Sequence, residues 1–262
     1  MPKSNSWALV TGASSGLGIE FAKALAARGS NIVLTARTAE PMERLANDLK
    51  RDHGVDAVVE ALDLSAAGGA RTLAERLDAR GIVPNILVNN AGFGLSGRFL
   101  DHDPARLAGM LQLNIVSLTE LAQIFGQRMA ARGQGRILMT ASLAAFQPGP
   151  LLAAYSASKS YVLSLGEALN VEFGPKVTVT VVCPGLMDTG FNAVADFETP
   201  KVFEASKLEP AEVAKIGLDA LFRGKSSVVA GRINRLAAFS TRFMTRHAAA
   251  KMTFNMTNGA KA

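Results

Sequence analysis

The chain has 262 residues, 48% of them apolar and 19% charged, which excludes a disordered or fibrous protein and predicts one or at most two globular domains. Its formal charge of +6 comes from the C-terminal part: six basic and no acidic residues follow Gly231, whereas the first 231 residues hold 22 basic and 22 acidic ones. A neutral body argues against nucleic-acid binding, which favours a basic face with interleaved aromatic residues.

The N-terminal residues 1–7 lack the apolar core of a signal peptide, and no uninterrupted apolar run approaches the roughly 18 residues that span a bilayer. We therefore expect a cytoplasmic protein. The single cysteine, Cys183, excludes an internal disulfide and a multi-cysteine metal site, and we expect no metal.

Short, mostly apolar runs alternate along the chain with longer helical patterns, most of which end at a glycine. The runs predict strands at 8–11, 31–36, 57–62, 85–89, 136–141, 177–183 and 227–230. The helical patterns cover 16–28, 39–52, 67–80, 104–131, 153–173 and 211–222. This alternation predicts an α/β fold: a doubly wound, Rossmann-like, seven-stranded parallel sheet with helices on both faces. We expect one such domain over 1–231 and a basic, amphipathic helical tail over 232–262.

The stretch TGASSGLG at 11–18 forms the turn between the first strand and the first helix. Its glycines permit a tight turn and close approach of a pyrophosphate, and the helix N-terminus offers unpaired N–H groups. The spacing is G-x-x-x-G-x-G rather than the commoner G-x-G-x-x-G. The turn predicts a dinucleotide site made by Gly12, Ser14, Ser15, Gly16, Leu17 and Gly18.

The same stretch contains G-x-S-x-G, the nucleophile turn of serine esterases, with Ser14 as the nucleophile. An esterase also needs a histidine after the serine, and none of His53, His102 and His247 stands at a persuasive strand end. We keep the esterase as a remote alternative.

The ends of strands two, three and four add further contacts for a dinucleotide. Strand two ends with Ala36 at the position of the usual ribose-binding carboxylate, and Arg37 follows it, which favours the 2′-phosphate of NADP over NAD. Asp63 and Leu64 stand where the adenine is contacted, although Asp63 could equally cap the next helix. Strand four runs into Asn89-Asn90-Ala91-Gly92, where the amides can tie strand ends together and Ala91 and Gly92 let the backbone approach the nucleotide.

Six motifs in order resemble the short-chain dehydrogenase/reductase family, in its single-domain form of about 250 residues. They are TGASSGLG at 11–18, NNAG at 89–92, Asn114, Ser142, YSASK at 155–159 and PGLMDT at 184–189. The resemblance covers roughly residues 6 to 230. It implies a catalytic role for Tyr155 as acid/base, Lys159 as the residue that tunes it and holds the nicotinamide ribose, Ser142 at the substrate oxygen, and Asn114 in a proton relay.

Residues Tyr155 and Lys159 are four positions apart and therefore share one helical face. A nearby ammonium is expected to lower the pKa of the phenol, which then exchanges a proton with a carbonyl or alcohol oxygen. The family resemblance also implies that Pro184, Gly185 and Thr189 contact the nicotinamide.

The segments that shape the substrate pocket in this family are mostly apolar here and show no histidine or arginine that would bind a carboxylate. They contribute Phe93, Leu95, Leu143, Phe146, Gln147, Leu151 and Phe191. We therefore expect a hydrophobic small-molecule substrate, a ketone or secondary alcohol that can be bulky or lipid-like, and an NADPH-preferring oxidoreductase. An NADP(H)-binding regulatory protein without turnover stays open as an alternative.

The tail beyond residue 231 places apolar residues on one predicted helical stripe, with arginines beside it. The stripe contains Leu236, Phe239, Phe243, Ala250 and Phe254, and the arginines are Arg235, Arg242 and Arg246. A contact with a neighbouring subunit is favoured over a lid on the substrate mouth, and membrane contact is the least favoured role. The family resemblance implies a homodimer or homotetramer through the helices that contain Asn114 and Tyr155.

Overall fold

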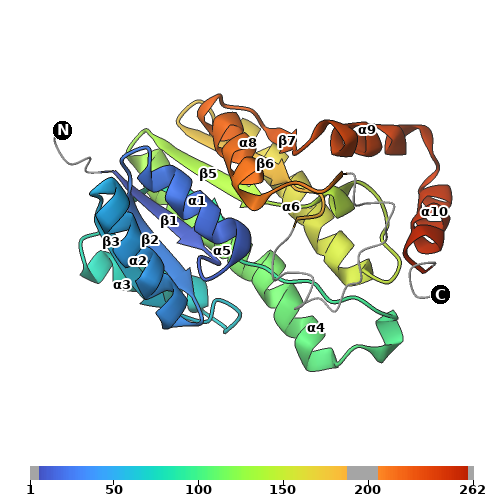
Figure 1. The fold of residues 1–262 in the computed structure, drawn as a ribbon, viewed down its shortest axis with the longest axis horizontal. Helices are drawn as coiled ribbons and strands as arrows, with labels where there is room; N and C mark the ends of the chain where they lie inside the picture. The colour runs from blue at the N-terminus through green and yellow to red at the C-terminus, as the bar shows by residue number, and fades with distance from the viewer. Residues whose placement is uncertain (1–5, 188–205, 259–262) are drawn as a thin grey trace.

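The computed structural model describes residues 6–187 and 206–258 and contains one parallel sheet of seven strands (Figure 1). The strand order is β3-β2-β1-β4-β5-β6-β7, so the direction of chain progression reverses between β1 and β4. The strands are β1 (Trp7–Thr11), β2 (Asn31–Ala36), β3 (Ala57–Ala61), β4 (Pro84–Asn89), β5 (Gly135–Thr140), β6 (Val177–Cys183) and β7 (Ser227–Val229). The predicted doubly wound sheet is confirmed, with strand ends displaced by at most one residue.

The strands are buried on both faces because helices cover each side of the sheet. One apolar cluster joins the sheet to α1 (Gly16–Ala26), α2 (Ala39–His53) and α8 (Pro210–Phe222). A second joins the other face to α3 (Gly69–Ala79), α5 (Leu118–Ala131) and α6 (Ala153–Phe173). Side chains alternate between the two clusters along each strand, as the period of two requires: in β1, Val10 lies in the first cluster and Leu9 in the second.

The predicted helix over 104–131 is not a single α-helix. It consists of α4 (Pro104–Leu111), a π-helical segment η2 (Gln112–Ser117) and α5. The Asp103 side chain caps α4 by accepting a hydrogen bond from the Ala105 N–H at 2.9 Å. The π segment contains Asn114, and such insertions in α-helices are frequent at functional sites.

The stretch Pro104–Ala131 is also, by length and composition alone, apolar enough to cross a membrane. Core helices of globular proteins meet the same criterion, and α5 packs its residues Leu121 and Phe125 into the second core cluster. The α5 part of the stretch therefore covers the sheet.

The C-terminal tail is helical but broken, which corrects the expectation of one continuous stripe. It forms α9 (Arg232–Ser240), the short helix η5 (Thr241–Phe243) and α10 (Arg246–Asn258). The backbone turns at Met244, and Thr245 begins α10 by accepting a hydrogen bond at its Oγ1 from the Ala248 N–H at 3.2 Å. As a result α9 and α10 run in different directions at one end of the molecule (Figure 1).

Candidate active site

A cavity of about 600 Å³ lies beyond the carboxyl ends of the strands, at the reversal between β1 and β4. Ligands of doubly wound sheets bind at this position. Most of the predicted nucleotide-binding residues line it: Gly12, Ser14, Ser15, Gly16, Leu17, Arg37, Asp63, Leu64, Asn90, Ala91, Gly92, Pro184 and Gly185. Gly18 does not line the cavity, and Thr189 lies outside the described residues.

The glycine turn has the geometry that the sequence requires of it. Gly12 and Gly16 have φ angles of +68° and +51°, which favour glycine, and a Cβ on Gly12 would lie 3.0 Å from the Cα of Ala91. A Cβ on Gly18 would lie 2.1 Å from the Gly12 carbonyl oxygen, so Gly18 serves the packing of the turn on α1. Helix α1 has no side-chain cap and no acidic residue in its first turn. Its first N–H groups and positive dipole end therefore suit a phosphate.

The residues after β2 and β3 differ in their contacts within the protein. Arg37 is exposed at the rim of the cavity and has no ion-pair partner among residues 6–187 and 206–258. Asp63 accepts hydrogen bonds from the Ser65 N–H at 2.8 Å and the Ser65 hydroxyl at 2.6 Å, and these contacts lower the pKa of its carboxyl. Asp63 therefore orders a turn and does not cap α3, which begins at Gly69.

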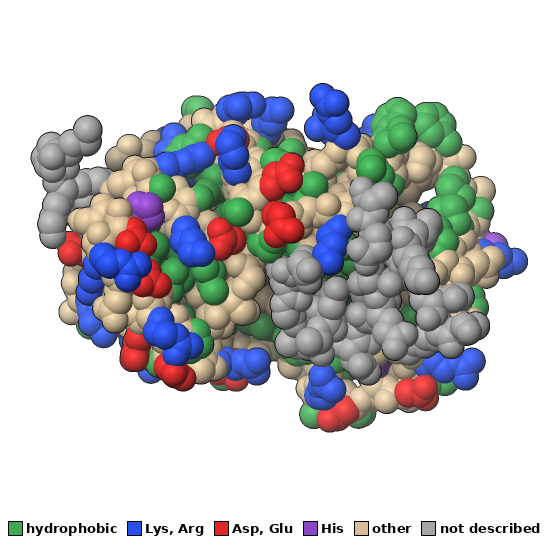
Figure 2. Space-filling model, in the orientation of Figure 1, with side chains coloured by type: hydrophobic (Ala, Val, Ile, Leu, Met, Phe, Trp, Pro, Cys, Tyr) green, Lys and Arg blue, Asp and Glu red, His purple; other side chains and the backbone are tan. Residues whose placement is uncertain are grey.

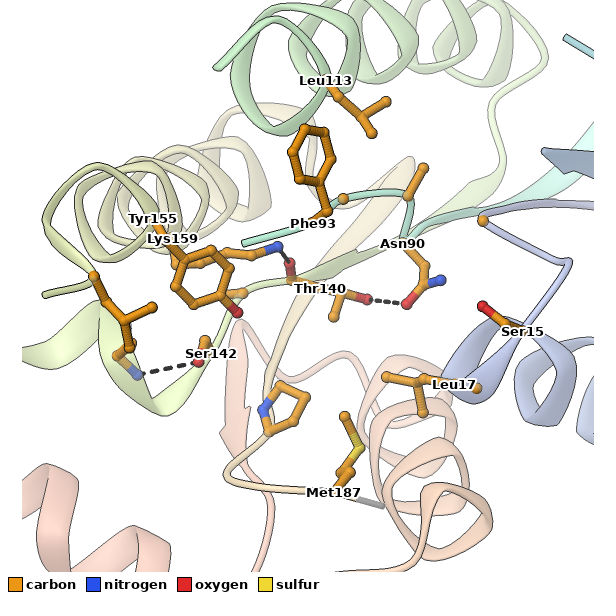
Figure 3. A pocket seen from close by; sticks show the side chains of 18 of the residues that line it. Ser15, Leu17, Asn90, Phe93, Leu113, Thr140, Ser142, Tyr155, Lys159 and Met187 are labelled. Atoms are coloured by element: carbon orange, nitrogen blue, oxygen red, sulfur yellow. Dashed lines mark hydrogen bonds between the residues drawn. The ribbon is translucent and has the colours of Figure 1, made fainter. Parts of the chain in front are cut away.

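A hydrogen-bond network ties the ends of β1, β4 and β5 together beneath the cavity. The Asn90 amide donates to the Thr11 carbonyl at 3.0 Å, and its oxygen accepts from the Thr140 hydroxyl at 3.2 Å. The Thr11 hydroxyl accepts from the N–H groups of Asn90 and Ala91 at 2.9 and 2.8 Å. Figure 3 shows the Asn90–Thr140 contact between the glycine turn and Lys159. These hydrogen bonds fix the glycine turn and the strand end beside Lys159 relative to each other, at the carboxyl edge of the sheet.

Three of the four polar residues expected to carry the chemistry, Ser142, Tyr155 and Lys159, converge at one end of this cavity (Figure 3). Ser142 follows β5 and makes a hydrogen bond with the Tyr155 phenol, while its Oγ also accepts from the Ala144 N–H at 3.2 Å. Lys159 Nζ donates to the Thr140 carbonyl at 2.8 Å and lies 5.8 Å from the centroid of the Tyr155 ring. The cap contact fixes Ser142, and the carbonyl fixes Lys159.

Burial, rather than the lysine charge, dominates the pKa of both titratable groups. Burial raises the pKa of the Tyr155 phenol to about 12, and the hydrogen bond with Ser142 opposes this rise. Burial also lowers the pKa of the Lys159 ammonium to about 8. The expectation that Lys159 lowers the phenol pKa is therefore wrong for the protein by itself, because both groups are removed from water.

Asn114 is buried beside this group, on the π-helical segment. Its amide donates to the Phe93 carbonyl at 2.9 Å and the Ser158 hydroxyl at 3.2 Å, and its oxygen accepts from the Phe93 N–H at 3.1 Å. A Cβ on Gly92 would lie 2.8 Å from the Asn114 oxygen and 3.5 Å from Lys159 Nζ. The Asn114 side chain therefore holds the Gly92–Phe93 backbone against the lysine.

The substrate end of the cavity agrees only in part with the expected residues. Phe93, Leu143 and Gln147 line it. Phe146 packs against the second core cluster, and Leu95 packs with Met110 and Tyr155. Leu151 contributes a turn with φ of 64°, and its carbonyl accepts from the Gly97 N–H. Phe191 lies outside the described residues.

The sequence reasoning missed part of the wall. Gly149, Leu152, Ser156 and Met187 line the cavity, and so do Thr253 and Thr257 of α10. The Gln147 amide donates to the Thr253 hydroxyl at 2.9 Å. The sequence allowed the tail as a lid on the substrate mouth, and the structure places its α10 part there; no local pattern shows which of its residues meet Gln147, 106 positions away.

The geometry of the cavity does not support a serine esterase or a metal site. No histidine lines the cavity, and all three histidines of the chain are described, so Ser14 has no base for an esterase mechanism. No group of three or more possible metal ligands occurs within the described parts of the chain. The cavity suits a dinucleotide better. The glycines of the turn have no Cβ atoms, so space for a pyrophosphate stays open, and the N-terminus of α1 has no side-chain cap. An arginine lies at the rim of the cavity.

Comparison with known proteins agrees with this fit. The family model described as short chain dehydrogenase matches residues 6–198. The probable oxidoreductase EphD of Mycobacterium tuberculosis is 36% identical over 193 residues, 73% of this chain but 32% of that protein. The very-long-chain 3-oxoacyl-CoA reductase of Podospora anserina is 34% identical over 224 residues, 83% of this chain and 65% of that protein. The chain thus spans about a third and about two thirds of these relatives.

Solved structures extend the similarity over nearly the whole chain. A short-chain dehydrogenase from Sphingobium yanoikuyae in complex with NADPH has a TM-score of 0.80 and 30% identity, and the match covers 91% of this chain and 93% of that one. The bulky-bulky ketone specific alcohol dehydrogenase from Comamonas testosteroni has a TM-score of 0.76 and 30% identity, with 94% and 98% covered. The residues matched by the family model include the glycine turn and the part of α6 that carries Tyr155 and Lys159. The chain belongs to the short-chain dehydrogenase/reductase family.

Proposed function

We propose that the protein is an NADPH-preferring carbonyl reductase, or the reverse alcohol dehydrogenase, that acts on a hydrophobic ketone or secondary alcohol. The observation that carries the proposal is the convergence of Ser142, Tyr155 and Lys159 on the cavity that also contains the glycine turn. A bound nicotinamide would supply or accept the hydride. The chain itself must bind the two partners, orient the carbonyl and provide the proton.

Each of the three residues has a contact that suits its proposed part. Tyr155 is a neutral phenol, since burial raises its pKa to about 12, and a neutral phenol can donate its proton to a carbonyl oxygen. Ser142 is held as a second hydrogen-bond donor beside the phenol and would stabilise negative charge on that oxygen. Lys159 is anchored by the Thr140 carbonyl and would reach ribose hydroxyls.

The cofactor preference rests on Arg37. Its guanidinium follows β2, lines the cavity and contributes to the lowered pKa of the Asp63 carboxyl, but it forms no close ion pair in the described chain, so its donors are available to a 2′-phosphate. Ala36, at the place of the ribose-binding carboxylate of NAD sites, removes the charge that would repel this phosphate. The NADPH complex of the Sphingobium yanoikuyae enzyme supports the same choice.

The substrate class follows from the lining at the Tyr155 end. The described lining there is mainly apolar and contains no arginine or histidine that would bind a carboxylate; its apolar residues are Phe93, Leu113, Leu143, Leu152 and Met187. The names of the bulky-ketone alcohol dehydrogenase and the very-long-chain reductase point in the same direction. We extend the proposal to a homodimer or homotetramer through the helices that contain Asn114 and Tyr155, where the large side chains of Val116 and Tyr161 are exposed.

The test follows NADPH and NADH absorbance with a panel of small, aromatic and long-chain ketones and alcohols, using the wild type and Tyr155→Phe. The proposal expects oxidation of NADPH with bulky apolar ketones, and loss of at least about 10²-fold of this turnover in the variant. NADPH binding without turnover of any ketone or alcohol would instead identify the regulatory protein. Turnover that survives in Tyr155→Phe would refute the assigned chemistry.

A further inference from the structure

Helix α9 is attached to the body through a small part of its surface. Asn234 and Ala238 are its buried residues. The Asn234 amide donates to the carbonyls of Ala230 at 2.8 Å and Ser206 at 3.1 Å, which fixes the start of the helix. The opposite side of α9 and of η5 faces outward. Its side chains, which we call the α9 face, are Arg232, Ile233, Arg235, Leu236, Phe239, Arg242 and Phe243.

The apolar side chains of the α9 face are unusually exposed. Leu236 is 70% and Phe243 is 78% exposed, and Ile233 and Phe239 are also exposed. The rings of Phe239 and Phe243 lie 5.3 Å apart in an edge-on contact, so they form one apolar group. Figure 2 shows hydrophobic side chains gathered over α9 at the upper right of the molecule. Contiguous apolar surface of this kind marks a contact with a partner or a membrane.

The basic side chains of the α9 face surround this apolar group. The guanidinium of Arg242 lies 5.7 Å from the centre of the Phe239 ring. Within residues 6–187 and 206–258, none of Arg232, Arg235 and Arg242 has an ion-pair partner. No acidic residue occurs from Arg232 to the end of the chain. The α9 face therefore suits a binding partner that offers both apolar and anionic groups.

Charge decides between the candidates for this occupant. A second copy that presented the same face would bring like charges together, which opposes a symmetric self-contact. A nucleic acid would satisfy the arginines but would offer little to Leu236 and Phe243. An anionic lipid surface satisfies both, since basic amphipathic helices lie at the boundary between headgroups and acyl chains. We propose that the α9 face binds an anionic membrane surface, with the apolar side chains among the acyl chains and the arginines at the lipid phosphates.

This proposal does not rest on the proposed catalytic function, and vesicle flotation of the full chain tests it. Vesicles of phosphatidylcholine are compared with vesicles that contain about one quarter phosphatidylglycerol, at low and high salt. Two variants remove the interaction: Leu236→Ser with Phe243→Ser, and Arg235→Gln with Arg242→Gln. Two controls make equal changes elsewhere: Leu100→Ser with Val83→Ser, both exposed and outside α5 and α6, and Arg71→Gln with Arg106→Gln.

The proposal expects binding to the anionic vesicles only, and binding that weakens with salt. The arginine pair should contribute about 25-fold, since each basic residue near an anionic surface contributes about fivefold. The apolar pair should contribute more than about tenfold, and neither control should change binding. Absence of binding, or equal weakening in the controls, would overturn the proposal. So would loss of an oligomer in Leu236→Ser with Phe243→Ser, measured by analytical ultracentrifugation, because the face would then be a contact between copies.

Discussion

Lys159→Met replaces the buried ammonium of the site with an apolar chain of similar length, and we expect it to change how stability depends on pH. Lys159 is 4% exposed, and burial lowers the pKa of its ammonium from 10.5 to about 8. Because one pKa unit corresponds to about 1.4 kcal/mol, the folded protein holds the charged form at a cost of about 3 kcal/mol. The protein therefore sacrifices stability to keep this group beside the phenol.

The sign of the effect follows from where the proton is held. Between pH 8 and 10.5 the unfolded chain still binds the lysine proton that the folded chain has released. The free energy of unfolding of the wild type consequently rises across this window, by up to about 3 kcal/mol, whereas below pH 8 the full cost is present. Lys159→Met lacks this dependence. Any stability difference in favour of the variant should therefore shrink by about 3 kcal/mol between pH 7 and pH 10.5.

Urea unfolding of the two proteins without added nucleotide, at both pH values, measures this difference directly. Tyr155 has a pKa raised to about 12 and is present in both chains, so its own titration cancels. Lys50→Met, at an exposed position of α2, is the control and should give the same difference at both pH values. A difference between wild type and Lys159→Met that does not change with pH would refute the burial argument. In a separate activity assay with NADPH, Lys159→Met should have lost carbonyl reduction.

Four further substitutions test other contacts. Tyr155→Phe should lower turnover by about 10²-fold or more while NADPH binding, followed by fluorescence, stays unchanged, because the proton donor alone is removed. Arg37→Glu should shift the ratio of kcat/KM values from NADPH toward NADH by more than about tenfold, as a 2′-phosphate loses its partner and gains a repulsion; an unchanged ratio would remove Arg37 from the site. Gly166→Ala should lower the free energy of unfolding by about 1–3 kcal/mol, because its Cβ would lie 2.2 Å from Val181 Cγ2. Gly109→Ala, with nothing within 4 Å, should instead stabilise α4 by up to about 1 kcal/mol in the same denaturation assay.

The sheet could be predicted closely because its information is local. Each strand is a short apolar run, and the alternation of Leu9 and Val10 between two cores is a direct consequence of the period of two. The nucleotide-binding end of the cavity could be predicted from the sequence for the same reason. A glycine turn after a strand places its contacts by backbone geometry, and the turn, Arg37 and Asn90 all follow strand ends.

The errors arise where local signals permit two structures. A π-helical turn needs only one extra residue, and the apolar pattern around Asn114 fits it as well as it fits an α-helix. The break at Met244 has no glycine or proline to mark it. Thr245, which caps α10, was the available signal, since threonine before a helical run is a typical start. Contacts such as Gln147–Thr253 depend on the path of the whole tail and have no local signal.

The pKa of Tyr155 depends on burial, which the spacing of two residues does not reveal. Four positions of separation place an ammonium near a phenol, but whether this lowers the phenol pKa depends on how much water both groups lose. Here Lys159 donates a hydrogen bond to the Thr140 carbonyl, and burial lowers the pKa of its ammonium to about 8. The protein by itself thus holds a neutral phenol beside a weakly basic amine. Such a phenol is ready to donate a proton, whereas the reverse reaction first requires a phenolate. At neutral pH Tyr155 is therefore present in the protonated form that carbonyl reduction consumes, while its raised pKa makes it a weaker acid than a free phenol.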